Sequence, residues 1–279
     1  MRSLVTLHPK HIIQATGHSG EKSFPSYIPG ISEFKGDRLC HSSEFLGARS
    51  DGKGKRAVVV GSCNSAHDIA QDFYEKGYDV TMVQRSSTYL PVEDADLVNY
   101  GTPLPVLKLI GVDIAAEIAR RDANLQKSLA AVGFKTDQAP DDSGFSMKYY
   151  QRGGGYYIDV GCSQLIADKK IHIIQGTQIS AIKDHSVVFA DGREAEADEI
   201  IFATGYQNMR STTRKIFGDE IAESVDDVWG LDEEGELRGM WRPTRHPRFW
   251  FMGGNLALAR YYSLLLALQI KAIELGLKK

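Results

Sequence analysis

Short apolar runs alternate with amphipathic stretches along most of the chain, which is the pattern of an α/β fold. The clearest run, Lys55–Gly61, is rich in β-branched residues and ends in glycine, so it predicts a buried parallel strand. A helical pattern follows over Ala66–Lys76, and Gly77 is placed to end that helix. Asp79–Val83 reads as a second strand. Together these segments predict one β-α-β unit within about 30 residues.

The remaining pattern is less regular and predicts a larger domain built around this unit. Residues 86–155 contain scattered prolines and a helical stretch near Asp113–Ala131, and we interpret them as a partly helical insertion. The elements expected after it are a short helix (Ser163–Ala167), a strand (Ile171–Gln175), a hairpin (Ile179–Lys183 and Ser186–Phe189) followed by a turn at Asp191-Gly192, a buried strand (Glu199–Gly205), a strand (Phe249–Gly254) and a long helix (Leu256–Leu275).

Composition and charge exclude several classes of protein. Hydrophobic residues make up 42% and charged residues 25% of the 279 residues, which is typical of a globular protein. The net charge of −3 gives no basic excess for nucleic acid or an anionic membrane. The longest aliphatic block, Leu264–Leu268, is too short to span a bilayer, so we expect no transmembrane segment.

The cysteines indicate a reducing compartment. There are 3 of them, Cys40, Cys63 and Cys162, and none forms a C-x-x-C motif. We therefore expect no disulfide framework and no metal site. Residues 1–4 also lack the apolar stretch of a signal peptide, which makes the cytoplasm the expected location.

The turn after the first strand carries a candidate phosphate-binding motif. It reads Gly61-Ser62-Cys63-Asn64-Ser65-Ala66 and connects a strand to a helix, where backbone N–H groups and the helix dipole favour a pyrophosphate. The spacing matches G-x-G-x-x-G/A except that Cys63 replaces the middle glycine. Cys63 is more simply a small side chain that fills the turn than a reactive thiol. An ordinary β-α turn without a ligand is the alternative interpretation.

The end of the second strand indicates which dinucleotide binds. An acidic residue at this place favours NAD, whereas an arginine accommodates the 2′-phosphate of NADP. The segment here is Gln84-Arg85-Ser86-Ser87, without a carboxylate. A guanidinium with two hydroxyl groups suits a phosphate dianion, so the sequence predicts NADP(H). The alternative is a surface arginine at a strand end.

Two further segments share an ending. Ile12–Gly17 and Ile200–Tyr206 are apolar runs that both close with Ala-Thr-Gly. Between them lies the spaced pattern Phe34-x-Gly36-x4-His41-Ser42-x-x-Phe45. On composition alone the two endings would be common strand-to-loop turns.

In this order, these segments resemble the flavin-containing monooxygenases, most of all a fungal and plant-auxin-pathway-like branch. The resemblance implies two dinucleotide-binding domains, one for FAD and one for NADPH. It also implies transfer of electrons from NADPH through FAD to O2, and oxygenation of a small organic substrate by a flavin C4a-hydroperoxide, without a catalytic side chain. The implied cofactor contacts beyond the Gly61 and Arg85 segments are Thr16, Gly17, Ala203, Thr204, Gly205, Tyr206, Gly254 and Asn255.

The resemblance also predicts the domain organisation. Residues 48–197 would form a complete NADP-binding Rossmann-like domain. Residues 1–47 would be a remnant of the FAD domain with a crossover linker, and 198–279 its C-terminal part. The chain begins 14 residues before Ala15, whereas the family places the FAD-binding glycine turn upstream of that point. We therefore expect a truncated chain whose FAD domain is incomplete.

The order of segments leaves three alternatives for function. The first is a monooxygenase that uses NADPH and FAD. The second is a non-catalytic NADP-binding remnant of such an enzyme. A pyridine-nucleotide disulfide reductase has the same two-domain layout, but the missing C-x-x-C speaks against it. His41 matches the histidine of the family signature, and we assign it no acid–base role.

Overall fold

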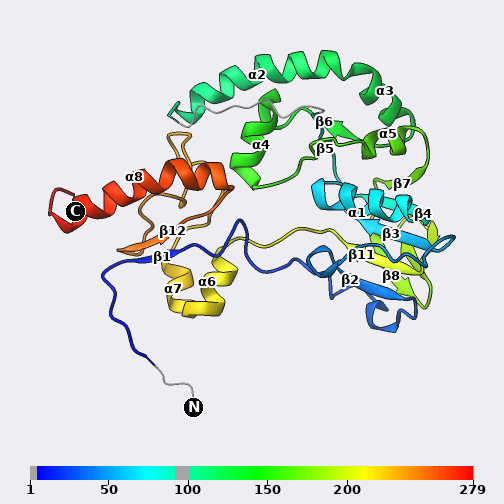
Figure 1. Ribbon diagram of the computed structural model, residues 1–279, viewed down its shortest axis with the longest axis horizontal. Coiled ribbons are helices and arrows are strands. Elements are labelled where there is room, and N and C mark those ends of the chain that lie inside the picture. The colour runs from blue at the N-terminus through cyan, green and yellow to red at the C-terminus, as the bar shows by residue number, and fades with distance from the viewer. Residues whose placement is uncertain (1–4, 92–100, 279) are drawn as a thin grey trace.

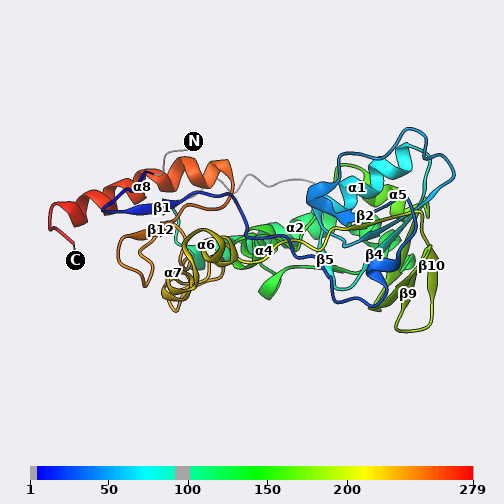
Figure 2. The same cartoon turned by 90° about the horizontal axis from the view of Figure 1, so that it is seen from below.

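The computed structural model describes residues 5–91 and 101–278, and it shows two lobes joined by crossover segments and a helical insertion (Figures 1 and 2). Residues 1–4, which carried the signal-peptide argument, lie outside the described part. The first lobe is built on a five-stranded parallel sheet in the order β2-β11-β3-β4-β7. Its strands are β2 (Arg38–His41), β11 (Glu199–Phe202), β3 (Arg56–Val60), β4 (Asp79–Gln84) and β7 (Ile171–Gln175).

Alternation along β3 explains how both faces of this sheet are covered. Val59 packs in a cluster with α1 (Asn64–Glu75) and α5 (Cys162–Ala167). Val58 points to the other face and packs in a cluster with the antiparallel strands β8 (Ile179–Lys183) and β9 (Ser186–Phe189). β10 (Glu194–Glu196) completes that second sheet. A continuous apolar strand is therefore required at the centre of the lobe.

The second lobe joins segments from both halves of the sequence. β1 (Ile12–Gln14) pairs in parallel with β12 (Phe249–Phe251). α6 (Arg210–Phe217), α7 (Asp219–Ser224) and α8 (Leu256–Glu274) lie around this pair (Figure 1). Its core contains Trp241, Trp250 and Leu258, and it extends to Leu107 and Met147 of the insertion. The pairing places β1 beside β12, although more than 200 residues separate them in the sequence.

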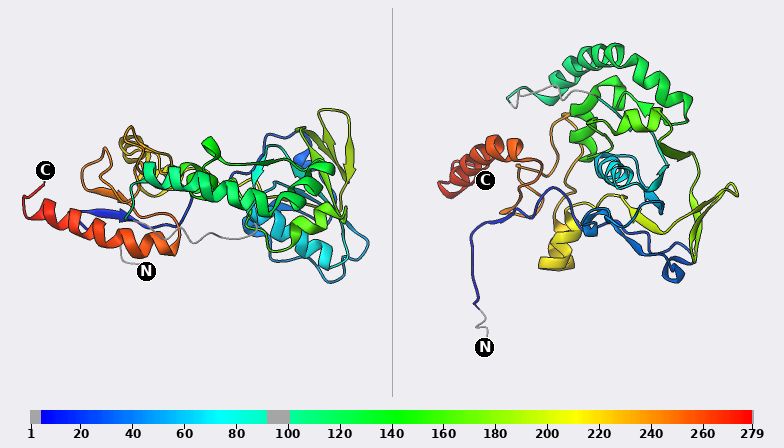
Figure 3. Two further views of the ribbon diagram at one scale, coloured as in Figure 1. Left: turned by 90° about the horizontal axis from the view of Figure 1, so that it is seen from above. Right: turned by 45° about the vertical axis from the view of Figure 1, so that its right-hand side comes forward.

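The insertion is mostly helical and lies along one side of the molecule (Figure 3). It contains β5 (Thr88–Tyr89), α2 (Leu104–Arg121), α3 (Ala123–Ala131), β6 (Thr136–Asp137), the 3-10 turn η3 (Pro140–Asp142) and α4 (Gly144–Arg152). β5 pairs with β6, which places the segment after α3 beside the segment after β4. Two further 3-10 turns are η1 (Ile31–Glu33), on the first crossover segment between β1 and β2, and η2 (Ser42–Glu44), which directly follows β2.

The predicted elements agree with the structure where the local pattern is strong. β7, β8 and β9 have the predicted bounds, and β3, α1 and β4 form the expected unit. The helical stretch expected near Asp113–Ala131 is instead two helices that meet at Asp122. The predicted domain boundaries at residues 47 and 197 stay a prediction. They assign β2 and β11 to the segments on either side of the Rossmann-like domain, although both strands pair within the five-stranded sheet.

α8 modifies the expectation about membranes. By length and composition alone, this helix is apolar and long enough to cross a bilayer, although the core helix of a soluble protein passes the same test. The block Leu264–Leu268 is shorter than the apolar part of this helix, because apolar and aromatic residues flank the block on both sides. Leu258 and Leu266 are its buried residues, whereas Leu264 and Leu268 are 67% and 66% exposed.

Candidate functional site

Three predicted segments meet at one edge of the five-stranded sheet. β11, β3 and β4 are parallel neighbours, so the loops that follow them leave from the same edge. These loops contain Gly61–Ala66, Arg85–Ser87 and Ala203–Tyr206. In open parallel sheets ligands bind outside the carboxyl ends of the strands. The structure therefore brings together the residues that were predicted to bind a pyrophosphate and those that were predicted to bind a 2′-phosphate.

Gly61 is required by the neighbouring strand. Its φ is +139°, and a Cβ atom there would lie 2.4 Å from the carbonyl oxygen of Ala203. The Gly61 N–H donates to the carbonyl of Val83 at 3.0 Å. The glycine thus lets the end of β3 pass closely under the second Ala-Thr-Gly segment.

Cys63 occupies the middle-glycine position without strain. Its backbone is extended (φ −107°, ψ −172°), and its sulfur accepts a hydrogen bond from the Gly155 N–H. Burial raises the pKa of the Cys63 thiol, so the side chain is a neutral, packed group. The backbone N–H groups of Ser62 and Cys63 donate to no other described residue. Together with the amino end of α1, they fit a pyrophosphate.

Side chains of this turn hold the turn itself. The Ser62 hydroxyl lies 2.9 Å from the Thr88 hydroxyl, and Asn64 Oδ1 accepts the Ile158 N–H at 3.0 Å. Ser65 is exposed and Ala66 is buried. Backbone groups, rather than side chains, are therefore what the turn can offer to a ligand.

Arg85, Ser86 and Ser87 are all exposed at the end of β4. The Ser87 hydroxyl donates to the carboxylate of Asp137, which comes from β6. This carboxylate was missed in the sequence because it is 50 residues away from Ser87 and reaches the strand end only through the β5–β6 pairing.

The second Ala-Thr-Gly segment is fixed by the first crossover. The Thr204 hydroxyl donates to the Ser23 carbonyl at 2.5 Å. The Gly205 carbonyl accepts the Ser23 N–H and the His41 Nε2–H, both at 2.9 Å. His41 is buried, burial lowers its pKa, and its Nδ1 accepts the Ser43 N–H at 3.2 Å. The signature histidine is thus a neutral side chain whose hydrogen bond to Gly205 joins the segment after β2 to the segment after β11.

Four residues predicted to contact the flavin lie at the carboxyl edge of the two-stranded sheet formed by β1 and β12. Thr16 and Gly17 follow β1, and Gly254 and Asn255 follow β12, so the parallel pair brings them together. The Asn255 N–H donates to the Tyr149 hydroxyl at 2.9 Å, and its Oδ1 caps α8 by accepting the Leu258 N–H at 2.9 Å.

Two of these four residues are already engaged within the chain. The Asn255 N–H, which would face the flavin, is already bonded to Tyr149 of α4. The Thr16 hydroxyl accepts a hydrogen bond from Gln14. β3, Gly61 and α1 form a unit of strand, glycine turn and helix that suits a pyrophosphate, and Arg85 follows the neighbouring strand β4.

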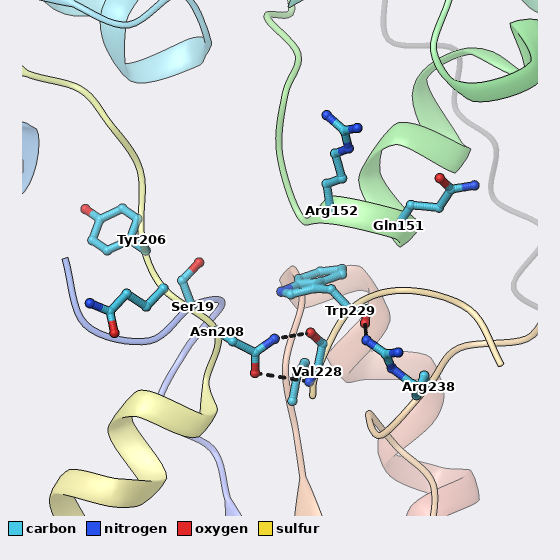
Figure 4. Close-up of a pocket in the computed structure, with 9 residues that line it drawn as sticks. Ser19, Gln151, Arg152, Tyr206, Asn208, Val228, Trp229 and Arg238 are labelled. Carbon is cyan, nitrogen blue, oxygen red and sulfur yellow. Dashed lines mark hydrogen bonds between the residues drawn. The ribbon is translucent and has the colours of Figure 1, made fainter. Parts of the chain in front are cut away.

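A pocket of about 300 Å³ lies where the two crossover segments meet α4 (Figure 4). The Arg238 Nη2 donates to the Trp229 carbonyl at 3.2 Å. Arg152 forms no hydrogen bond or ion pair with any described residue. Of the lining residues only Tyr206 was predicted. Arg152 could have been found as a charged residue beside the Gly153–Gly155 triplet. The lining residues are Ser19, Gln151, Arg152, Tyr206, Gln207, Asn208, Val228, Trp229 and Arg238.

No metal centre accompanies these sites. Among the described residues, no three His, Cys, Asp or Glu side chains are grouped so that they could hold a metal ion.

Several known proteins are similar to this chain. A family model for L-lysine 6-monooxygenase/L-ornithine 5-monooxygenase matches residues 3–208. Two similar curated proteins are the probable indole-3-pyruvate monooxygenases YUCCA10 and YUCCA1 of Arabidopsis thaliana. YUCCA10 is 31% identical over 71% of this chain and 49% of its own length. YUCCA1 is 29% identical over 71% of this chain and 47% of its own length.

A solved structure with the same fold is OTEMO, in complex with FAD and NADP. It has a TM-score of 0.57 and 15% identity, with 96% of this chain and 62% of that chain covered. The chain spans about half the length of the curated relatives that it matches. Because the family model covers most of the 279 residues, the protein belongs to the flavin-containing monooxygenases, in the L-lysine 6-monooxygenase/L-ornithine 5-monooxygenase family.

Proposed function

We propose that this chain is the NADP(H)-binding part of an NADPH- and FAD-dependent monooxygenase that inserts one oxygen atom from O2 into a small organic substrate. One observation carries the proposal. The Gly61 turn, the amino end of α1 and Arg85 share one edge of the five-stranded sheet. This edge presents unpaired N–H groups to a pyrophosphate and a guanidinium to a 2′-phosphate.

The pocket supports a planar acid as the substrate class. Trp229 offers an aromatic ring, and two arginines, Arg152 of α4 and Arg238, are among the lining residues. A guanidinium recognises a carboxylate through a fork of parallel N–H groups. The relatives act, by name, on indole-3-pyruvate, an aromatic 2-oxo acid. We therefore propose an aromatic 2-oxo acid for this pocket.

A second candidate function is a non-catalytic NADP-binding protein. The observation that favours it is the bond from the Asn255 N–H to Tyr149, which occupies one of the flavin contacts expected at this edge. On this basis we expect that the chain binds NADPH but holds FAD weakly, and that its oxygenase activity is low. The two candidates share the NADP(H) site and differ in FAD.

The NADP(H) site is tested by titrating NADPH and NADH into purified protein by calorimetry. Arg85→Ala removes a charged contact worth roughly 1.5–3 kcal/mol, so NADPH affinity should fall about ten- to a hundredfold, with little change for NADH. Arg49→Ala, which removes an exposed arginine paired with Asp51, serves as the control. An equal loss for both nucleotides would show that Arg85 does not read the 2′-phosphate.

The FAD question needs a separate measurement. FAD is titrated into the same protein, and NADPH oxidation is then followed with an aromatic 2-oxo acid. Weak FAD binding and low turnover support the non-catalytic candidate. Tight stoichiometric FAD with substrate-dependent turnover would establish the monooxygenase.

A further inference from the structure

Lys135 is held against the end of β4 by an unusual pair of hydrogen bonds. The Gln84 side chain is fully buried, and its carboxamide contacts both backbone groups of Lys135. Gln84 Nε2 donates to the Lys135 carbonyl at 2.8 Å, and the Lys135 N–H donates to Gln84 Oε1 at 2.7 Å. The Thr88 N–H also donates to the Lys135 carbonyl, at 3.1 Å.

These bonds place Lys135 beside the segment Arg85–Ser87. Gln84 directly precedes that segment and Thr88 directly follows it, so both of its ends are tied to the backbone of one lysine. Lys135 and Arg85 are exposed, and neither side chain has a hydrogen bond or ion pair with another described residue. Two neighbouring cations without a counter-ion favour the binding of an anion.

The nearby carboxylate does not oppose an anion. Asp137 lies two residues after Lys135, and its two oxygens accept hydrogen bonds from Lys148 Nζ at 2.8 and 2.7 Å. Lys148 is itself mostly buried, with 7% of its side chain exposed. Since Lys148 balances the charge of Asp137, Arg85 and Lys135 leave this strand end with a net positive charge.

We propose that Lys135 is a second cation of the 2′-phosphate site, and that Gln84 is the positioning residue that sets it beside Arg85. The inference rests on the proposed NADP(H) binding and extends it to residues that come from the insertion. The phosphate dianion on the adenosine ribose would lie between the two side chains. The competing explanation is that the Gln84 bonds only attach the insertion to the sheet.

The test uses fragments that isolate the 2′-phosphate. Adenosine 2′,5′-bisphosphate and AMP are titrated into the full chain by calorimetry. Lys135→Met should weaken the bisphosphate about tenfold, because it removes one charge-assisted contact, and should change AMP by less than about twofold. Lys127→Met, at an exposed lysine of α3, is the matched control.

Gln84→Met tests the positioning role. If Gln84 acts through Lys135, it should reduce the preference for the bisphosphate as much as Lys135→Met does, and the double variant should lose no more than either single variant. Thermal melting verifies that each variant is folded. Additive losses would overturn the positioning role.

The outcomes separate this inference from the proposed function. If the wild-type chain does not prefer the bisphosphate over AMP, the proposed NADP(H) preference fails and the inference fails with it. If Arg85→Met removes the preference whereas Lys135→Met behaves as Lys127→Met does, the NADP(H) site stands and the role of Lys135 is refuted.

Discussion

Gly61 is a residue for which the backbone, rather than a ligand, sets the identity. Gly61→Ala would combine a positive φ with a Cβ placed 2.4 Å from the Ala203 carbonyl oxygen. We expect it to lower the free energy of unfolding by more than the roughly 1–3 kcal/mol typical of backbone strain alone, measured by urea denaturation. Gly54→Ala, with φ +81° and nothing within 4 Å, is the control for strain without a clash. Equal losses would show that Ala203 does not restrict this position.

His67 makes stability depend on pH. Its ring stacks on Tyr157 at 3.7 Å, Nδ1 lies 3.2 Å from the Cys63 carbonyl, and burial lowers its pKa from 6.5 to about 4. Between these two values the unfolded chain binds a proton that the folded chain does not. Stability should therefore be complete above pH 6.5 and fall by about 3 kcal/mol as the pH drops to 4.

The contribution of His67 is isolated by difference. Urea midpoints are measured from pH 7 to 4 for the wild type and for His67→Gln, which cannot take up this proton. The variant should be less stable at pH 7 and show a shallower decline on acidification. His185→Gln, at an exposed histidine, should leave the slope of the wild type unchanged. A His67→Gln slope equal to that of the wild type would contradict the prediction.

At the residue level, the sequence indicates which positions face the sheet edge but not how their side chains are engaged. Gly61 and Arg85 lie where the motif places them. The bonds of His41 to Gly205, of Asn64 to Ile158 and of Asn255 to Tyr149 were not predictable. Each depends on a partner more than 90 residues away, and a local pattern carries no information about such a partner.

At the scale of elements, one buried carboxylate joins β2 and β11 to the start of β4. Glu199 is fully buried; its carboxylate accepts Arg38 Nε–H at 2.7 Å and the Tyr78 hydroxyl at 2.6 Å. Glu199→Gln should cost about 3–5 kcal/mol of unfolding free energy, because it leaves the Arg38 charge without its partner. Glu196→Gln, at an exposed carboxylate, should cost less than about 1 kcal/mol in the same chemical denaturation assay. Similar costs for the two would show that the network is not stabilising.

Elements with a strong local period were predicted well, and elements that depend on their neighbours were not. β3, α1, β4 and α8 follow from apolar runs and from periodicity. α4 was missed because its buried face includes Ser146 and Lys148, which look polar in sequence. α6 was missed for a similar reason, since Thr213 is its one buried residue. In both helices tertiary contacts provide the stabilisation, and in α4 these include the buried Met147, Tyr149 and Tyr150.

At the scale of the whole molecule, the exposed face of α8 should govern self-association. Leu264 and Leu268 are mostly exposed, whereas Leu266 is 3% exposed. Exposed apolar patches of this kind promote association. The double substitution Leu264→Glu/Leu268→Glu should therefore reduce oligomers in light scattering and change the unfolding free energy by less than about 1 kcal/mol. Leu266→Glu should instead unfold the protein. Loss of folding in the double variant would show that this face is packed in solution.

The pairing of β1 with β12 also determines when the second lobe can form. Ile12, Ile13 and Gln14 align with Phe249, Trp250 and Phe251, so more than 200 residues separate the partners. During synthesis β1 leaves the ribosome before β12, and among the described residues β12 is its strand partner. The β3-α1-β4 unit is made of local contacts and can fold long before that. The apolar residues of β1 thus stay accessible to chaperones and proteases through most of translation, and closure of the second lobe becomes a late step of folding.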